Sequence, residues 1–107
     1  MGGSRYADAV LQVEIVSERE EVAGWAFVVQ VLDDEGVLRR HEVTMAWADY
    51  NLWSASGGDE PAAVVAAVVR FMLSRVGHAD DVPATFDASL ARRRYEGADE
   101  AIPGLIG

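Results

Sequence analysis

The run from Pro61 to Val76 constrains the fold more than any other feature, because almost every residue in it is apolar. Asp59 is expected to cap a helix at its start, Pro61 suits the first helical turn, and Gly77 suits the position after the end. The sequence therefore predicts one long helix over residues 61–76. Its polar residues are Arg70, Ser74 and Arg75.

This helix has more apolar surface than one sheet can cover, since a helix packed on a single sheet usually keeps a polar outer face. One stripe, which we assign to the sheet, consists of Val65, Val69, Met72 and Val76. A second flank of small side chains consists of Ala63, Val64, Ala66 and Ala67. Either the segment from Asp87 to Ile106 folds back over this flank or a second subunit covers it, and both alternatives stay open.

Three segments ahead of the helix show the alternation of apolar side chains that is typical of β-strands. The polar residues 17–21 are predicted to connect the first two strands, and residues 33–36 to form a turn in which Gly36 has a positive φ. Because the connections are short, we expect an antiparallel meander with the first and third strands at its edges. The middle strand is apolar on both faces, which is typical of a central strand. The predicted strands span residues 10–17, 22–32 and 37–47.

The segment after the long helix predicts short elements only. Residues 78–86 are expected to form a loop, and Asp87 to cap a helix that contains residues 90–95 and ends at Gly97. Residues 99–106 add one more helical turn, interrupted at Pro103. The whole pattern predicts an α+β fold: a three-stranded antiparallel meander packed against one long apolar helix, with one or two short C-terminal helices.

A chain of 107 residues has room for one hydrophobic core, so we expect a single domain over residues 1–107 with flexible ends at about residues 1–6 and at residue 107. No apolar run approaches the roughly 20 residues that a membrane-spanning helix needs. The first residues show no apolar stretch typical of a secretory signal. The absence of cysteine fits a reducing compartment. We therefore expect a cytoplasmic protein that does not bind a membrane.

The chain is strongly acidic, because 18 acidic residues oppose nine basic ones and give a net charge of −9. DNA binding relies on lysine and arginine side chains that neutralise phosphates, so this charge argues against a nucleic-acid partner. Twelve of the acids lie between Asp8 and Glu60, where there are only three arginines. The sheet is therefore expected to present a negatively charged face.

Two patterns of spaced residues stand out in the first half of the chain. They are Gly24-Trp25-x-Phe27-x-Val29-x-Val31-x-Asp33-x-x-Gly36 and His41-x-Val43-Thr44, followed by Asp49-Tyr50 and later by Phe86-Asp87. Residues 10–95 thereby resemble an uncharacterised family of short bacterial proteins, in which a β-meander is followed by a helix. The resemblance implies the fold, and it implies no activity, cofactor or catalytic residue.

Few residues suggest a catalytic or metal site. Histidine is a common catalytic base, but no nucleophile accompanies His41, so a surface histidine on the exposed start of the third strand is the simpler interpretation. His78, Asp80 and Asp81 could hold a divalent cation, yet their spacing matches no calcium or zinc motif. The run from Arg92 to Arg94 points in three directions on a helix, which favours a solvated surface over an anion site. The sequence therefore predicts no catalytic residue, no cofactor and no metal ligand.

An aromatic segment follows the third strand, whose apolar face is expected to end at Trp47. Asp49, Tyr50 and Trp53 are predicted to lie on a helical turn, with the two aromatic side chains on the same side. Tyrosine and tryptophan often anchor interfaces, yet Trp53 could instead plug the end of the core with Tyr50 over it. The candidate interface residues are Tyr50, Trp53, Ala63 and Ala67.

Three kinds of function are compatible with these features. The apolar helix and the aromatic segment favour a small acidic non-enzymatic protein-interaction module, with a protein partner or as a homodimer. The acidic sheet is also compatible with an inhibitor or antitoxin-like protein that binds a basic protein surface. The third alternative is a small ligand-binding protein or enzyme with a pocket between sheet and helix, although the chain offers no recognisable nucleophile motif.

Overall fold

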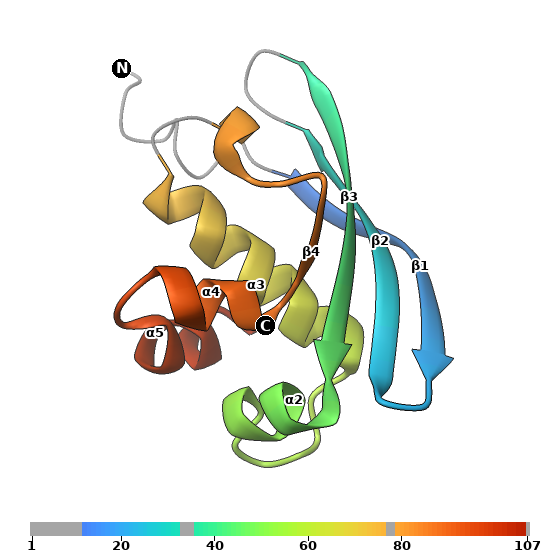
Figure 1. The fold of residues 1–107 in the computed structure, drawn as a ribbon, viewed down its shortest axis with the longest axis vertical. Helices are drawn as coiled ribbons and strands as arrows, with labels where there is room; N and C mark the ends of the chain where they lie inside the picture. The colour runs from blue at the N-terminus through green and yellow to red at the C-terminus, as the bar shows by residue number, and fades with distance from the viewer. Residues whose placement is uncertain (1–11, 33–35, 77–78, 107) are drawn as a thin grey trace.

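The computed structural model describes residues 12–32, 36–76 and 79–106. A four-stranded sheet forms one layer, three helices lie on one of its faces and a fourth lies at one end (Figure 1). The predicted α+β class is therefore confirmed, but the sheet has four strands instead of three. The strands are β1 (Gln12–Glu21), β2 (Gly24–Leu32), β3 (Leu38–Ala46) and β4 (Thr85–Asp87), and the helices are α2 (Trp47–Trp53), α3 (Pro61–Arg75), α4 (Ser89–Arg94) and α5 (Ala98–Leu105), with a 3₁₀ turn, η1, at Ala79–Asp81.

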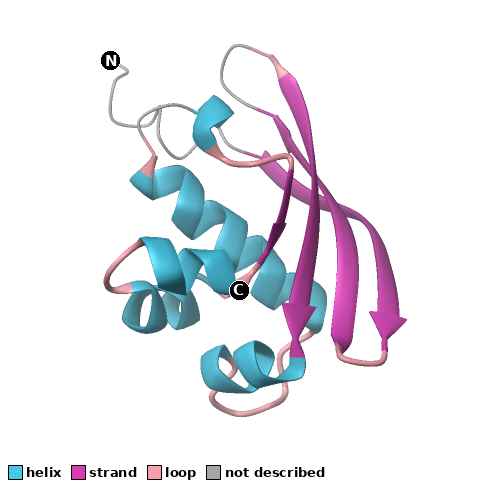
Figure 2. Cartoon of the chain, viewed as in Figure 1, coloured by secondary structure: helices cyan, strands magenta, loops and turns pink. Residues whose placement is uncertain are grey.

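The hairpin of β1 and β2 is longer than predicted (Figure 2). Residues 17–21, expected as a loop, continue β1, and the turn consists of Val22 and Ala23. A β-bulge between Ile15 and Ser17 shifts the register within the strand. The polar residues after the bulge do not look like a strand in the sequence, because they line an exposed edge where their side chains remain hydrated.

β2 lies between β1 and β3, as expected for the most apolar strand, and its side chains alternate between the two faces of the sheet. The face toward the helices carries the buried residues Trp25, Phe27, Val29 and Val31. The opposite face carries the half-buried residues Ala26, Val28, Gln30 and Leu32. None of the described helices covers this second face, which we call the open face.

β4 is a three-residue strand that runs parallel to β3, so the prediction that the third strand is an edge was wrong. The amide of Glu42 donates to the carbonyl of Ala84 at 2.7 Å, and the amide of Ala88 donates to the carbonyl of Thr44 at 2.7 Å. Three residues are too few to show an alternating pattern, which is why the sequence predicts only a loop over residues 78–86.

α3 is buried on most sides, and its cover comes from within the chain. α5 packs against it and α4 contacts it as well (Figure 1). Ala67, in the middle of the small-residue flank, has no exposed surface. Of the two alternatives, the structure therefore shows the C-terminal segment folded back over α3, and this flank needs no second subunit.

The start of α3 differs in detail from the prediction. The helix begins at Pro61, as expected, but its cap residue is Glu60 and that residue's side chain makes no capping hydrogen bond. The carboxylate of Asp59, predicted as the cap, instead accepts a hydrogen bond from the Ser54 hydroxyl at 2.7 Å. Asp59 therefore stabilises the loop before the helix rather than the helix terminus.

Two short helices follow β4, separated by Gly97 with a φ of 84°, a conformation that favours glycine. Asp87 acts at the start of α4 as expected, since its carboxylate accepts a hydrogen bond from the Ser89 amide at 3.1 Å, although Ala88 is the cap residue. Pro103, predicted to interrupt the last turn, lies inside α5. The helix tolerates it because only one donor is lost, close to the end of a short helix.

Some predictions fall outside the described residues. These are the flexible ends at residues 1–6 and 107, the start of the first strand at residues 10–11, the turn residues 33–35, the helix end at Gly77, and His78. The close of that turn is described, and Gly36 has the predicted positive φ, at 81°.

Candidate functional site

α2 is held at one end of the sheet by the chain around it. The Trp47 amide donates to the Ala23 carbonyl at 3.1 Å, which ties the start of the helix to the turn between β1 and β2. Gly24 permits this close approach, because a Cβ at its position would lie 2.0 Å from the carbonyl oxygen of Met45. The hairpin turn and α2 therefore share one end of the molecule (Figure 1).

Three aromatic rings pack together at this end. The ring centroids of Trp25 and Trp47 are 4.4 Å apart, and that of Tyr50 lies 5.2 Å from Trp25 and 6.4 Å from Trp47. The Tyr50 hydroxyl lies within hydrogen-bonding distance of the carbonyl oxygens of Gly57 (3.1 Å) and Asp59 (2.5 Å). These contacts fix Tyr50 in the interior and hold the loop between α2 and α3 against the aromatic cluster.

The residues predicted to form an interface lie largely inside the chain. Trp53 is 1% exposed, and its indole N–H donates to the Asp99 carboxylate at 3.0 Å. Tyr50 is 7% exposed, Ala67 is fully buried and Ala63 is half-buried. This placement favours the alternative in which Trp53 closes the end of the core. Contact of these four residues with a partner stays a prediction.

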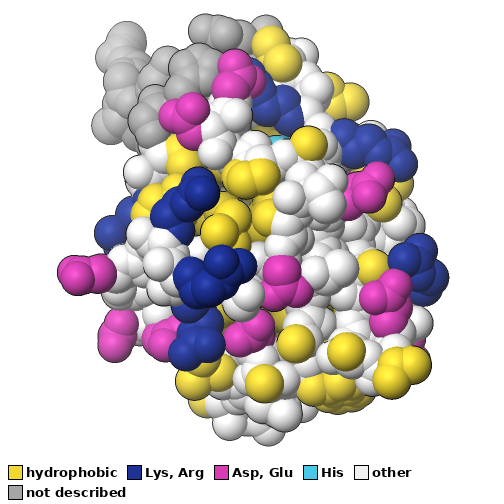
Figure 3. Space-filling model, in the orientation of Figure 1, with side chains coloured by type: hydrophobic (Ala, Val, Ile, Leu, Met, Phe, Trp, Pro, Cys, Tyr) yellow, Lys and Arg dark blue, Asp and Glu magenta, His cyan; other side chains and the backbone are white. Residues whose placement is uncertain are grey.

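Different side chains are displayed at this end. Trp47 is 44% exposed, Leu52 is 46% exposed, and Val22 at the hairpin turn is fully exposed. The sequence places Trp47 on the core face of the third strand, but β3 ends at Ala46 and α2 begins, which leaves the Trp47 ring half exposed. We call the end of the molecule that displays Val22, Trp47 and Leu52 the apolar end. Figure 3 shows hydrophobic side chains gathered at this lower end of the molecule.

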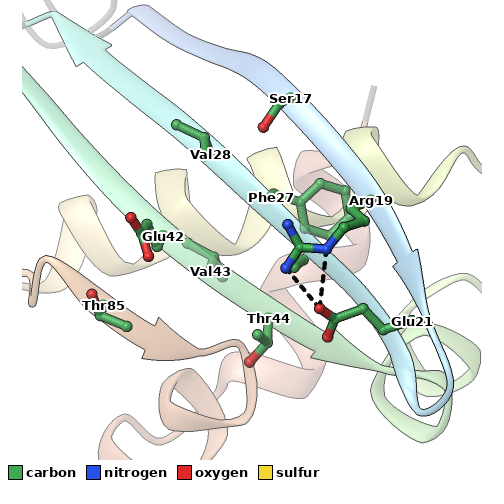
Figure 4. Close-up of a pocket in the computed structure, with 10 residues that line it drawn as sticks. Ser17, Arg19, Glu21, Phe27, Val28, Glu42, Val43, Thr44 and Thr85 are labelled. Atoms are coloured by element: carbon green, nitrogen blue, oxygen red, sulfur yellow. Dashed lines mark hydrogen bonds and ion pairs between the residues drawn. The ribbon is translucent and has the colours of Figure 1, made fainter.

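The open face of the sheet contains a hollow (Figure 4). Its volume is about 240 Å³, and the half-buried side chains of Ala26 and Val28 form its apolar floor. On one side, the Arg19 guanidinium is bonded to the Glu21 carboxylate, with Nη2 and Oε2 2.8 Å apart. The other polar side chains around the hollow are Ser17 of β1, Glu42 and Thr44 of β3, and Thr85 of β4.

A second hollow, of about 260 Å³, adjoins the first and extends toward the apolar end, where Ala46, next to Trp47, lines it. Glu21 and Thr44 line both hollows, and the second one extends to Ala23 and Gly24. Ala23 is the residue whose carbonyl accepts the Trp47 amide. The two hollows therefore extend from the open face to residues adjacent in sequence to Val22 and Trp47.

A group of charged side chains joins α2 to α4 and α5. Arg92 lies between two acids: its Nη1 is 3.4 Å from the Asp49 carboxylate and its Nε is 2.9 Å from the Asp99 carboxylate. Burial raises the pKa of the Asp49 carboxyl above its ordinary value, the negative charge of Asp87 adds to the rise, and Arg92 offsets part of it. Arg92 thus serves to hold the helices together, while Arg93 and Arg94 are exposed.

Asp87 fastens β4 to β3. The Thr44 hydroxyl donates to its carboxylate at 2.5 Å, and the Ser89 amide donates at 3.1 Å. Burial alone would raise the pKa of Asp87, but these hydrogen bonds and the positive charge of Arg93 outweigh burial, so the pKa lies below its ordinary value. The charged form of Asp87 is therefore favoured by the fold.

His41 is buried, and the prediction of a surface histidine was wrong. Its ring is 3% exposed, Nδ1 lies 2.7 Å from the Pro83 carbonyl oxygen, and the ring meets Phe86 edge-on. Because a carbonyl only accepts, Nδ1 carries the proton, and Nε2 has no hydrogen-bond partner among the described residues. The alternation of β3 places His41 on the core face with Val43 and Met45. A ring enclosed in this way cannot act as a base on a substrate at the surface.

The predicted alternative of a cation site in the loop after α3 gains no support. His78 lies outside the described residues, and the Asp80 carboxylate accepts a hydrogen bond from the Arg39 guanidinium at 2.8 Å. In the part of the chain that the structure describes, no group of three or more His, Cys, Asp or Glu side chains could hold a metal ion.

Comparison of the chain with protein-family models, with curated proteins and with solved structures found no match. The resemblance to a family of short bacterial β-meander proteins therefore stays a prediction. No helix in the described ranges is long and apolar enough to cross a membrane.

Proposed function

We propose that this protein is a small non-enzymatic interaction module that binds a protein partner through the apolar end and the adjoining open face. The observation that carries the proposal is the half-exposed Trp47 ring, 4.4 Å from the ring of Trp25. Tryptophan and tyrosine dominate binding hot spots, because they offer a large contact area with few rotatable bonds. A ring already packed against a buried neighbour loses little further freedom when a partner covers it.

The apolar end is distinguished from other exposed hydrophobic side chains by its grouping. Val16, the adjacent pair Val37 and Leu38, and Leu105 are also exposed, but they lie in three separate parts of the chain. Scattered single hydrophobic residues are ordinary on a protein surface and need no partner. At the apolar end, by contrast, Trp47 lies beside the hairpin turn, and its neighbour Ala46 lines the second hollow. Grouping of this kind favours a binding surface.

An inhibitor of a basic protein surface is a second candidate, favoured by the charge of β1. This edge strand carries one arginine, Arg19, and the exposed acids Glu14, Glu18, Glu20 and Glu21. Such an edge attracts a basic surface and repels a second acidic copy of the chain. The two candidates differ in salt dependence, because about 1 M salt screens exposed charges and leaves apolar contacts in place.

The test is capture of a partner by the tagged full-length protein from an extract of the source organism. Trp47→Asp is expected to reduce recovery of the partner roughly tenfold or more, the loss typical of a hot-spot residue. Arg94→Asp, on the exposed surface of α4, is the matched control and should recover it normally. The melting temperature of each variant establishes that it is folded.

Undiminished capture by a folded Trp47→Asp variant would overturn the proposal. If that variant fails to fold, Leu52→Asp takes its place. Leu52 is exposed at the same end of the molecule and lies outside the cluster of aromatic rings.

A further inference from the structure

Glu42 lines the hollow of the open face (Figure 4). The strand register places it beside Val28 of β2 and Thr85 of β4. Its side chain is exposed, and among the described residues no hydrogen bond or ion pair engages its carboxylate. The arginine that lines the hollow, Arg19, is already neutralised by Glu21. The lining of the hollow therefore offers a carboxylate that no lining cation pairs with, and the nearest cation on the same face of β3, Arg40, lies outside the lining.

A long cationic side chain matches this arrangement. Its methylene stem would lie over Ala26 and Val28, as the stems of lysine and arginine do on apolar surfaces. Its positive head would reach the carboxylate of Glu42, in a charge-assisted hydrogen bond. An anionic ligand would instead face the carboxylate of Glu42. A second copy of this chain is disfavoured as the donor, because each copy has a net charge of −9.

We infer that the hollow receives a lysine or arginine side chain from the partner protein that binds the apolar end. The inference rests on the proposed function, because the second hollow joins the Glu42 hollow to Ala23 beside Trp47. Glu20, two residues before the exposed Val22, adds an exposed negative charge near the hairpin turn. The partner surface is therefore basic next to an apolar centre, and its positive charge also guides its approach.

The test is a nuclear magnetic resonance titration of the nitrogen-15-labelled full-length chain with the capped peptide Thr-Val-Lys-Val-Thr. We expect the amide resonances of Val28, Glu42 and Thr85 to shift in a saturable manner. The same peptide with glutamate in place of lysine should leave them unchanged. Glu42→Gln should raise the Kd for the lysine peptide about threefold or more, the range of an exposed ion pair. Glu14→Gln, an exposed acid of β1 outside the hollow, is the matched control and should leave the Kd unchanged.

Several results would overturn the inference. One is no shift around the hollow with the lysine peptide, and another is equal shifts with the glutamate peptide. Equal weakening by Glu14→Gln and Glu42→Gln would show general charge attraction without a specific site. If spermidine shifts the same resonances with a lower Kd than the lysine peptide, the hollow binds a free polyamine instead of a protein side chain.

The capture experiment separates this inference from the proposed function. If Trp47→Asp abolishes capture but the lysine peptide produces no shifts, the proposed interaction module stands and the assignment of the hollow is wrong. If neither Trp47→Asp nor Glu42→Gln weakens capture, the proposed interaction module and the assignment of the hollow are both wrong. Weaker capture by both variants, together with a response to the lysine peptide, supports both.

Discussion

Gly24 is the residue on which the geometry of the apolar end depends most directly. A Cβ at this position would lie 2.0 Å from the carbonyl oxygen of Met45 and 2.9 Å from the Cα of Ala46, closer than real Cβ atoms approach. β2 and β3 would have to separate beside the turn that bonds to Trp47. We therefore predict that Gly24→Ala lowers the free energy of unfolding by about 2 kcal/mol or more, measured by urea denaturation.

Gly58→Ala is the matched control for that substitution. The nearest atom to its added Cβ is the Ser56 hydroxyl oxygen, at 3.4 Å, so the free energy of unfolding should change by less than about 0.5 kcal/mol. Equal losses from the two variants would mean that the strands do not approach as closely as described.

Asp49 carries a charge whose burial is only partly compensated. Burial and the charge of Asp87 raise its pKa above the ordinary 3.8, in spite of Arg92. The fold therefore favours the protonated form of Asp49. Its contribution to the free energy of unfolding is fully present below pH 3.8 and is lost as the pH rises through the raised pKa. Because asparagine does not ionise, Asp49→Asn should raise the free energy of unfolding at neutral pH, and the two proteins should converge in acid. Denaturation curves across this pH range check the prediction, and a less stable variant at neutral pH would show that the pair with Arg92 dominates.

At the scale of elements, the contact between α3 and α5 closes the core. Ala67 of α3 has no exposed surface, so Ala67→Glu would force a longer, charged side chain into a packed interface. We predict that it lowers the free energy of unfolding by about 3 kcal/mol or more, or prevents folding. Arg70→Glu places the same carboxylate on the exposed side of this helix and should cost about 0.5 kcal/mol or less. An unchanged melting temperature for Ala67→Glu would mean that α5 does not cover this flank.

The strands could be predicted where one face is buried and the alternation is clear. The predicted strands at residues 22–32 and 37–47 match β2 and β3 to within two residues at each end. The last residues of β1 could not be recognised, because their charged side chains lie on an exposed edge and resemble a loop. β4 could not be recognised either, because it depends on backbone hydrogen bonds to β3 that residue type does not reveal.

Which side chains are displayed depends on contacts between distant parts of the chain. Trp53 is buried because its indole meets Asp99 of α5, an element far along the chain, whereas Trp47 is half exposed because β3 ends one residue before it. His41 is the opposite case. Its spacing of two and four residues from Val43 and Met45 indicates the buried face of the strand, but histidine is a polar residue type that suggests a surface position.

At the scale of the whole molecule, the sheet and the other helices cover the long helix α3 within one chain. Two copies of the chain repel each other, because each has a net charge of −9. We therefore expect the purified protein to be monomeric at micromolar concentration, with a mass near 11.6 kDa by light scattering. A dimer that dissociates on Trp47→Asp would show that the apolar end pairs with a second copy, which contradicts a separate partner.

The most direct measurement of partner binding is photo-crosslinking from position 47. Benzoylphenylalanine replaces Trp47 in one protein and Arg94, on the exposed surface of α4, in another, and both are irradiated in an extract of the source organism. A partner seated on the apolar end predicts a discrete crosslinked protein from position 47 and none from position 94. Crosslinks from position 94 alone, or from neither position, would contradict an interaction module that uses this end of the molecule.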